Sequence, residues 1–125
     1  MHPDKFKQVA GLPSAERHAY FVRKVADTQE VWGLHHDGWA TAQLDGKVAI
    51  PFWPEAAFAQ ACASGDWEHF QPRAIALDDF LAKWLPGMAE NKQLAFVFPV
   101  PQGSASIAEP ADLLSDVQHE SEQYE

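Results

Sequence analysis

The sequence predicts a single-domain α+β sandwich in which a mostly antiparallel sheet of about four or five strands is covered by helices. Three observations predict this fold. Residues 31–53 carry two Asp-Gly turns between apolar runs, amphipathic helical patterns flank this segment, and a strongly apolar strand pattern follows at 94–98. The central segment is the part around which the rest of the chain is expected to pack.

Residues 31–53 predict a three-stranded antiparallel meander. Asp37-Gly38 and Asp45-Gly46 are hairpin signals, because glycine adopts positive φ without a Cβ clash. Two turn lengths compete at each of them. A two-residue turn at Asp45-Gly46 would pair Leu44 with Lys47, whereas a three-residue turn would shift the register by one residue.

Burial should select the register, because a slip of one residue moves every side chain of a strand to the opposite face. The three-residue turn gathers the apolar side chains on one face, and we therefore predict that register, with Ala42 opposite Val48 and Ala40 opposite Ile50. The inward face would hold Trp32, Leu34, Ala40, Ala42, Val48, Ile50 and Phe52. The outward face would hold Val31, His35, Trp39, Thr41, Lys47 and Trp53.

Helices are predicted on both sides of the meander. Ser14 is expected to cap a helix that runs to about Asp27, with one stripe formed by His18, Phe21, Val22 and Val25. On that stripe, His18 is expected to be a packed, hydrogen-bonded histidine rather than a catalytic one. The other expected elements are helices at 2–10, 54–64, 78–85 (ended by Pro86-Gly87) and from Pro110 onward, short extended segments at 67–70 and 74–77, and a strand at 94–98.

The composition limits the possible partners. The net charge of −9 disfavours nucleic acid and anionic membrane surfaces, which require clustered Lys and Arg. Six of the 18 acidic residues lie in 102–125, which has no Lys or Arg, so we divide the chain into a compact α+β domain at 1–108 and a C-terminal helix with an acidic tail at 109–125.

The single cysteine, Cys62, forbids an intramolecular disulfide and favours a cytoplasmic location. No apolar run is long enough for a membrane span.

Several short strings occur along the chain in a characteristic order and spacing. They are Val31 to Leu34, Gly38 to Ala40, Pro51 to Glu55, Phe58-Ala59, Cys62, Trp67, Ile75, Leu77, Asp79-Phe80, Trp84 to Pro86 and Val97 to Pro99. Together they resemble the small bacterial proteins of the domain of unknown function 2750 family, over about Phe21 to Leu114. The resemblance implies a compact, single-domain, bacterial cytosolic protein and assigns no activity to any residue.

The sequence gives no catalytic residue, no metal ligand set and no cofactor. It contains no G-x-S-x-G, G-x-G-x-x-G or P-loop string, and its serines fall in expected caps, loops or the tail. His35-His36-Asp37 is the only cluster with ligand chemistry. Adjacent strand residues point to opposite faces, so His69 or Glu68 could complete a metal site only through the fold.

The candidate binding surface is the outward face of the meander, with His35, Trp39 and Trp53. Large aromatic side chains on a solvent face mark a contact surface. The competing interpretation is that a second layer covers them, for example the helix that carries Trp84.

Three functions remain open. The first hypothesis is a non-catalytic cytosolic module that binds another protein, or a second copy of itself as a homodimer, through this face and the acidic tail. The second is a small-molecule site, with a pocket between sheet and helix lined by His35, Trp39 and Trp53. The third is a hydrolase whose site is assembled from distant His and acidic residues.

Overall fold

The computed structural model describes residues 3–101 and 105–122, and it has the predicted α+β architecture. Its strands form two ladders, one with the order β1-β4 and one with the order β2-β3-β5-β6. All pairings are antiparallel except that of β3 with β5, which is parallel. The strands are β1 (Glu30–His35), β2 (Ala42–Leu44), β3 (Lys47–Phe52), β4 (Gln71–Ala76), β5 (Leu94–Val97) and β6 (Ser106–Ala108).

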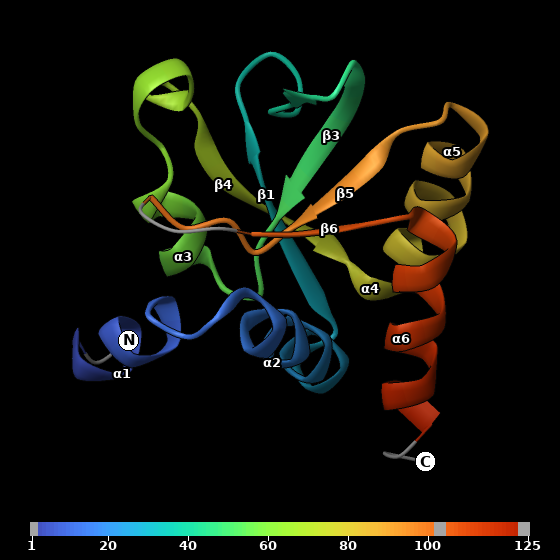
Figure 1. Cartoon of the computed structure of the whole chain (residues 1–125), viewed down its shortest axis with the longest axis horizontal. Coiled ribbons are helices and arrows are strands. Elements are labelled where there is room, and N and C mark those ends of the chain that lie inside the picture. The colour runs from blue at the N-terminus through green and yellow to red at the C-terminus, as the bar shows by residue number, and fades with distance from the viewer. Residues whose placement is uncertain (1–2, 102–104, 123–125) are drawn as a thin grey trace.

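The two ladders meet at a single backbone pair. The Trp32 N–H donates to the Trp53 carbonyl at 2.9 Å, and the Trp53 N–H donates to the Trp32 carbonyl at 2.8 Å. As a result β1 lies between β4 and β3, and Figure 1 shows β1 and β3 meeting near the middle of the molecule.

The predicted meander is wrong at its first hairpin. After Asp37-Gly38 the returning chain makes the bridge between His35 and Trp39, and the Ala40 N–H donates to the Leu34 carbonyl at 2.9 Å. β2 then diverges, and β1 pairs over its whole length with β4, about forty residues later in the chain. The local turn is present, but a non-local strand takes the pairing that the meander would have used.

The second hairpin is present, but in the other register. Asp45 and Gly46 both have positive φ, 51° and 79°, so the turn has two residues and Leu44 pairs with Lys47. The predicted three-residue register is therefore wrong. Two consecutive left-handed residues match the twist of the flanking strands. Burial does not select the register here, because the later part of β3 is buried without alternation, as expected for a strand covered on both faces.

The helices lie near the predicted positions, with four differences. Ser14 is the first residue of α2 and Pro13 stands at the cap position, so the expected cap by Ser14 is wrong. The helix predicted at 54–64 is shorter, Ala56–Ala61. Helical structure continues through the predicted stop at Pro86, because a π-helical segment precedes it and Pro86 falls in the first turn of α5, where its missing N–H is tolerated. The segment 67–70, expected to be extended, is instead the end of a short 3-10 helix followed by a turn. The elements are α1 (Pro3–Ala10), α2 (Ser14–Thr28), α3 (Ala56–Ala61), η1 (Gly65–Trp67), α4 (Leu77–Asp79), η2 (Phe80–Trp84), α5 (Leu85–Glu90) and α6 (Pro110–Glu122).

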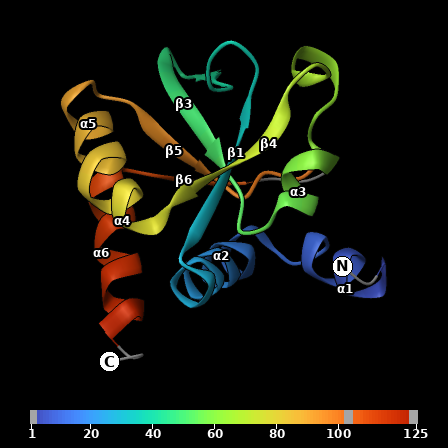
Figure 2. The same ribbon diagram turned by 180° about the vertical axis from the view of Figure 1, so that it is seen from behind.

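Helices pack on both sides of the sheet and at its end. α1 and α2 lie along the lower edge in Figure 1, α3 packs on β1 and β4, and α6 packs against α2 and α5. The view from behind shows α4, α5 and α6 together on one side of the molecule and α1 and α3 on the other (Figure 2). Leu113 and Val117 of α6 are fully buried, so this helix contributes to the core. The acidic residue Glu125 lies outside the described residues.

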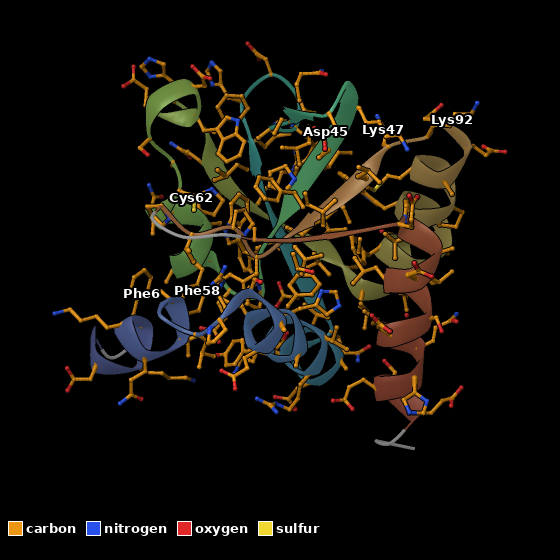
Figure 3. All side chains as sticks on the ribbon, in the orientation of Figure 1. Phe6, Asp45, Lys47, Phe58, Cys62 and Lys92 are labelled. Carbon is orange, nitrogen blue, oxygen red and sulfur yellow. The ribbon has the colours of Figure 1, made fainter. Side chains whose placement is uncertain are left out.

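Aromatic side chains fill the space between these elements. Phe58 of α3 stacks on Phe6 of α1 at 4.9 Å between ring centroids, and Figure 3 shows the two rings beside each other. Phe58 also contacts Phe98 at 4.8 Å, and Phe52 contacts Phe80 at 4.8 Å. Aromatic pairs therefore connect α1 to α3, and the residue after β5 to α3, while another pair connects β3 to η2.

Arg17 is a buried charge in this core. Its side chain is 4% exposed, its Nε–H donates to the Phe98 carbonyl at 3.3 Å, and its Nη1 donates to the Leu12 carbonyl. Its Nη2 has no hydrogen-bond partner among the residues the structure describes. Burial lowers the pKa of this guanidinium, as expected for a charged group removed from water.

The Pro99 carbonyl accepts hydrogen bonds from two side chains. The Trp53 indole N–H donates to it at 2.8 Å and the Cys62 thiol at 3.3 Å. Cys62 is 7% exposed, and burial raises the pKa of its thiol to about 11, with the hydrogen bond to Trp53 acting in the opposite direction. Cys62 is therefore a buried, protonated thiol.

We predict that Cys62 makes stability fall with rising pH above about 9. The ordinary thiol pKa of 9.0 applies to the unfolded chain, and the folded value is about 11. Between these values the unfolded chain binds fewer protons than the folded one, so the free energy of unfolding must decrease as pH rises. Urea unfolding at several pH values between 8 and 10.5 measures this decrease. In Cys62→Ala the free energy of unfolding should fall less steeply with rising pH. An equal dependence on pH in both proteins would contradict the prediction.

Candidate functional site

The structure separates His35, Trp39 and Trp53, the three residues of the predicted binding surface. Trp53 is 0% exposed, so the expectation that it lies on a solvent face is wrong. Its backbone pairs with Trp32 and its indole N–H bonds the Pro99 carbonyl, which fixes it in the interior. His35 and Trp39 remain together at the surface, both partly exposed, with ring centroids 5.0 Å apart.

Two further residues complete this group. Trp84 of η2 meets the Trp39 ring edge-to-face at 4.9 Å, and the Arg73 guanidinium lies over the same ring, 5.6 Å from its centroid. We refer to His35, Trp39, Arg73 and Trp84 as the aromatic–guanidinium patch. It lies where β1 ends and β4 begins, at the upper end of the sheet in Figures 1 and 2.

The strand register positions the patch. Gly33 pairs with Arg73 across β1 and β4, and the Trp39 ring occupies the space above Gly33. A Cβ at Gly33 would stand 2.9 Å from Cζ3 of Trp39, closer than van der Waals contact permits. The missing side chain thus allows Trp39 to lie on the sheet. Trp84 supports it from the other side and rests on Phe52 at 5.8 Å.

Arg73 carries the charge of the patch. Its Nη1 donates to Nε2 of His35 at 3.3 Å, which requires that nitrogen to be unprotonated. Arg73 is exposed, and among the described residues no carboxylate lies within ion-pair distance of it. The contacts with Trp39 and His35 therefore hold a guanidinium in place, while its remaining N–H donors are not used by an acidic side chain of the described chain.

Sequence reasoning missed Arg73 and placed Trp84 only as a possible cover. The one signal for Arg73 is its position beside Pro72, between two segments expected to be extended, which suits an edge strand. The pairing of Gly33 with Arg73 is what brings it to Trp39. That pairing joins residues forty positions apart, and no local pattern encodes it.

The histidine cluster does not assemble into a metal site. The rings of His36 and His69 lie 6.3 Å apart, and His69 contacts Glu68 at 3.3 Å. In residues 3–101 and 105–122 no group of three or more His, Cys, Asp or Glu side chains is arranged to hold a metal ion. His35 instead turns to Arg73, as adjacent residues at the end of a strand diverge.

The chain was compared with known protein families and proteins. A family model described as "Protein of unknown function (DUF2750)" matches residues 18–117. No curated protein matches the chain. In the described parts of the chain, no helix combines the length and the apolar character that crossing a membrane requires.

We predict that Gly33→Ala destabilises the protein by about 1–3 kcal/mol, the usual effect of forcing extra volume into a packed site. The new methyl group must displace Trp39, so the near-UV circular dichroism of the tryptophans should change as well. Urea unfolding measures the loss of stability.

Gly87→Ala is the matched control. Gly87 lies within α5, and a Cβ there would meet no atom within 4 Å. Alanine in place of a helical glycine should stabilise by up to about 1 kcal/mol. Equal effects of the two substitutions would show that Trp39 does not depend on the space at Gly33.

Proposed function

The chain belongs to the DUF2750 family of proteins of unknown function, and we propose that it acts as a protein-interaction module whose contact surface is the aromatic–guanidinium patch. The partner is another protein that presents an acidic side chain to Arg73. The observation that carries this proposal is the guanidinium held over Trp39 and beside His35 without a carboxylate partner in the described chain.

The residue types support a contact surface. Trp and Arg are the side chains most enriched among the residues that dominate binding energy in protein interfaces. Here they come from separate elements, with Trp39 after β1, Arg73 on β4 and Trp84 on η2. A surface assembled from packed elements is already ordered before binding, which reduces the entropy lost when a partner docks.

The electrostatics support an acidic contact at this position. A guanidinium fixed in orientation can donate two parallel hydrogen bonds to one carboxylate, and such charge-assisted pairs are about twice as strong as neutral hydrogen bonds. The net charge of −9 repels acidic proteins at long range. We therefore expect a partner whose acidic residue is surrounded by neutral or basic ones, with the acidic residues of α6 aiding encounter.

Small-molecule binding at the predicted pocket has weaker support. Trp53, one of its three expected lining residues, is fully buried. A hollow of about 470 Å³ lies elsewhere, between α2 and α6. The patch is a partly exposed aromatic surface with an exposed Arg73, which suits a protein partner better than an enclosed ligand.

We predict that Arg73→Glu weakens partner binding by about 30-fold or more, the effect of losing a residue that dominates an interface. The experiment captures proteins from the native cell with a tagged copy and then measures the affinity of the captured partner for each purified variant. Charge reversal should act without unfolding the protein, because Arg73 is exposed. Thermal melting verifies that the fold is retained.

Arg23→Glu is the matched control, because Arg23 is also exposed and lies over an aromatic ring, 6.0 Å from the centroid of Tyr20. It should bind the partner as the unmodified protein does. Equal affinities for Arg73→Glu and the unmodified protein would overturn the proposal. If sedimentation shows a dimer that Arg73→Glu dissociates, the partner is a second copy of the chain rather than another protein.

A further inference from the structure

A hydrogen-bonded serine, histidine and aspartate lie at the other end of the molecule. Nδ1 of His18 is 3.0 Å from Oγ of Ser106, and Nε2 of His18 is 3.1 Å from Oδ2 of Asp116. The three residues come from α2, β6 and α6, and the two contacts span 88 and 98 residues of sequence. The fold alone brings them together.

A single tautomer of neutral His18 satisfies both contacts. If Nε2 carries the proton, it donates to Asp116, and the lone pair on Nδ1 accepts the hydroxyl proton of Ser106. In this arrangement the imidazole is oriented by a carboxylate and its free nitrogen faces a serine hydroxyl. This is the geometry by which a histidine activates a nucleophile, with hydrogen-bond distances in the range the chemistry requires.

An open hollow of about 470 Å³ is lined by His18, Asp116 and other residues of α2 and α6. Ser106 is not among the lining residues and contacts the Nδ1 side of the His18 ring. The volume of the hollow lies in the range of small-molecule sites. Ala19 and Val22 contribute apolar surface to it, and Asp116 and Glu120 contribute negative charge. A neutral or cationic ligand would fit this lining, whereas an anionic one would be repelled.

We propose that Ser106, His18 and Asp116 form a nucleophilic site that hydrolyses small neutral or cationic esters. Oγ of Ser106 attacks the ester carbonyl carbon while its proton passes to Nδ1 of His18. The bond from carbon to the alcohol oxygen then breaks, and His18 gives this proton to the departing alcohol. A water molecule, deprotonated by His18, attacks the acyl-serine, releases the carboxylic acid and restores the Ser106 hydroxyl. Asp116 holds the ring orientation throughout.

This site is independent of the aromatic–guanidinium patch, since the two share no residue. A hydrolase assembled from distant residues was the third hypothesis drawn from the sequence, and His18 was expected to be a packed, hydrogen-bonded residue. His18 is hydrogen-bonded, but its side chain is 21% exposed and it lines the hollow. Ser106, one of the serines expected in caps, loops or the tail, lies in β6.

The test uses a fluorophosphonate probe, which reacts with activated serine hydroxyls, followed by intact mass measurement and peptide mapping. We expect a single adduct on Ser106. Ser106→Ala should abolish it, and His18→Gln should slow its formation by about 100-fold or more, the usual contribution of a general base. Ser64→Ala, at an exposed position on the loop after α3, is the control and should react as the unmodified protein does.

Ester hydrolysis tests the substrate class. 4-Nitrophenyl acetate should be hydrolysed faster than 4-nitrophenyl hemisuccinate, because the second carries a negative charge toward Asp116 and Glu120.

If His18→Gln does not fold, Asp116→Asn replaces it in the labelling experiment. The Asp116 side chain is half exposed, and its substitution should slow labelling at least tenfold. Absence of an adduct on the folded protein, or labelling unchanged in Ser106→Ala or in the folded His18 or Asp116 variant, would show that the cluster only fastens α2, β6 and α6 together.

Discussion

The backbone pair between Trp32 and Trp53 joins the two ladders into one sheet. The stability of this pair depends on the position of the Trp53 side chain. The indole is fully buried, and its N–H donates to the Pro99 carbonyl at 2.8 Å. A buried donor without a partner would cost about 1–3 kcal/mol. The same residue therefore connects β1 to β3 and attaches the segment after β5 to the core, so that sheet continuity and core packing depend on each other.

The position of β1 between its two neighbours decides which side chains reach the surface. β1 pairs with β4 on one side and meets β3 through Trp32 on the other, which places Gly33 beside Arg73. Since Gly33 has no side chain, Trp39 can cover the strand at that point and remain partly exposed. The patch thus forms because Gly33 permits Trp39 to approach β1 closely. Its arginine comes from β4, which is distant in the sequence from both Gly33 and Trp39.

The sequence carried the local features of this fold and not its long-range pairings. Helix α2 is visible from its apolar stripe at Phe21, Val22 and Val25, and the Asp45-Gly46 turn from its residue types alone. The register of β3 could not be predicted, because Pro51 to Trp53 are all buried and an apolar run on both faces has no alternation to read. Of the candidate surface, His35 and Trp39 were identified because the predicted alternation of side chains placed them on the outward face. Arg73 was not, because its pairing is non-local.

Two consecutive residues of α2 hold the connection that leads to β6. Arg17 donates to the Phe98 carbonyl at the end of β5, and His18 bonds Ser106 at the start of β6. Phe98 has a positive φ of 53°, and its N–H donates to the Phe52 carbonyl at 2.8 Å. A buried guanidinium with an unused N–H is costly, and here its hydrogen bonds secure the turn of the chain beyond β5.

This arrangement explains why a three-residue edge strand can present a serine in a defined position. The strand pairing of Ser106 with Val97 fixes it to β5, and the bond to His18 fixes it to α2, whose own position is set by Phe21 and Val25, both fully buried. A reactive group is useful only when packed elements hold it within a fraction of an ångström of its working geometry. The core of this protein supplies such support to Ser106 and His18, because the element that carries each of them is attached to buried residues, β6 through Val97 and α2 through Phe21 and Val25.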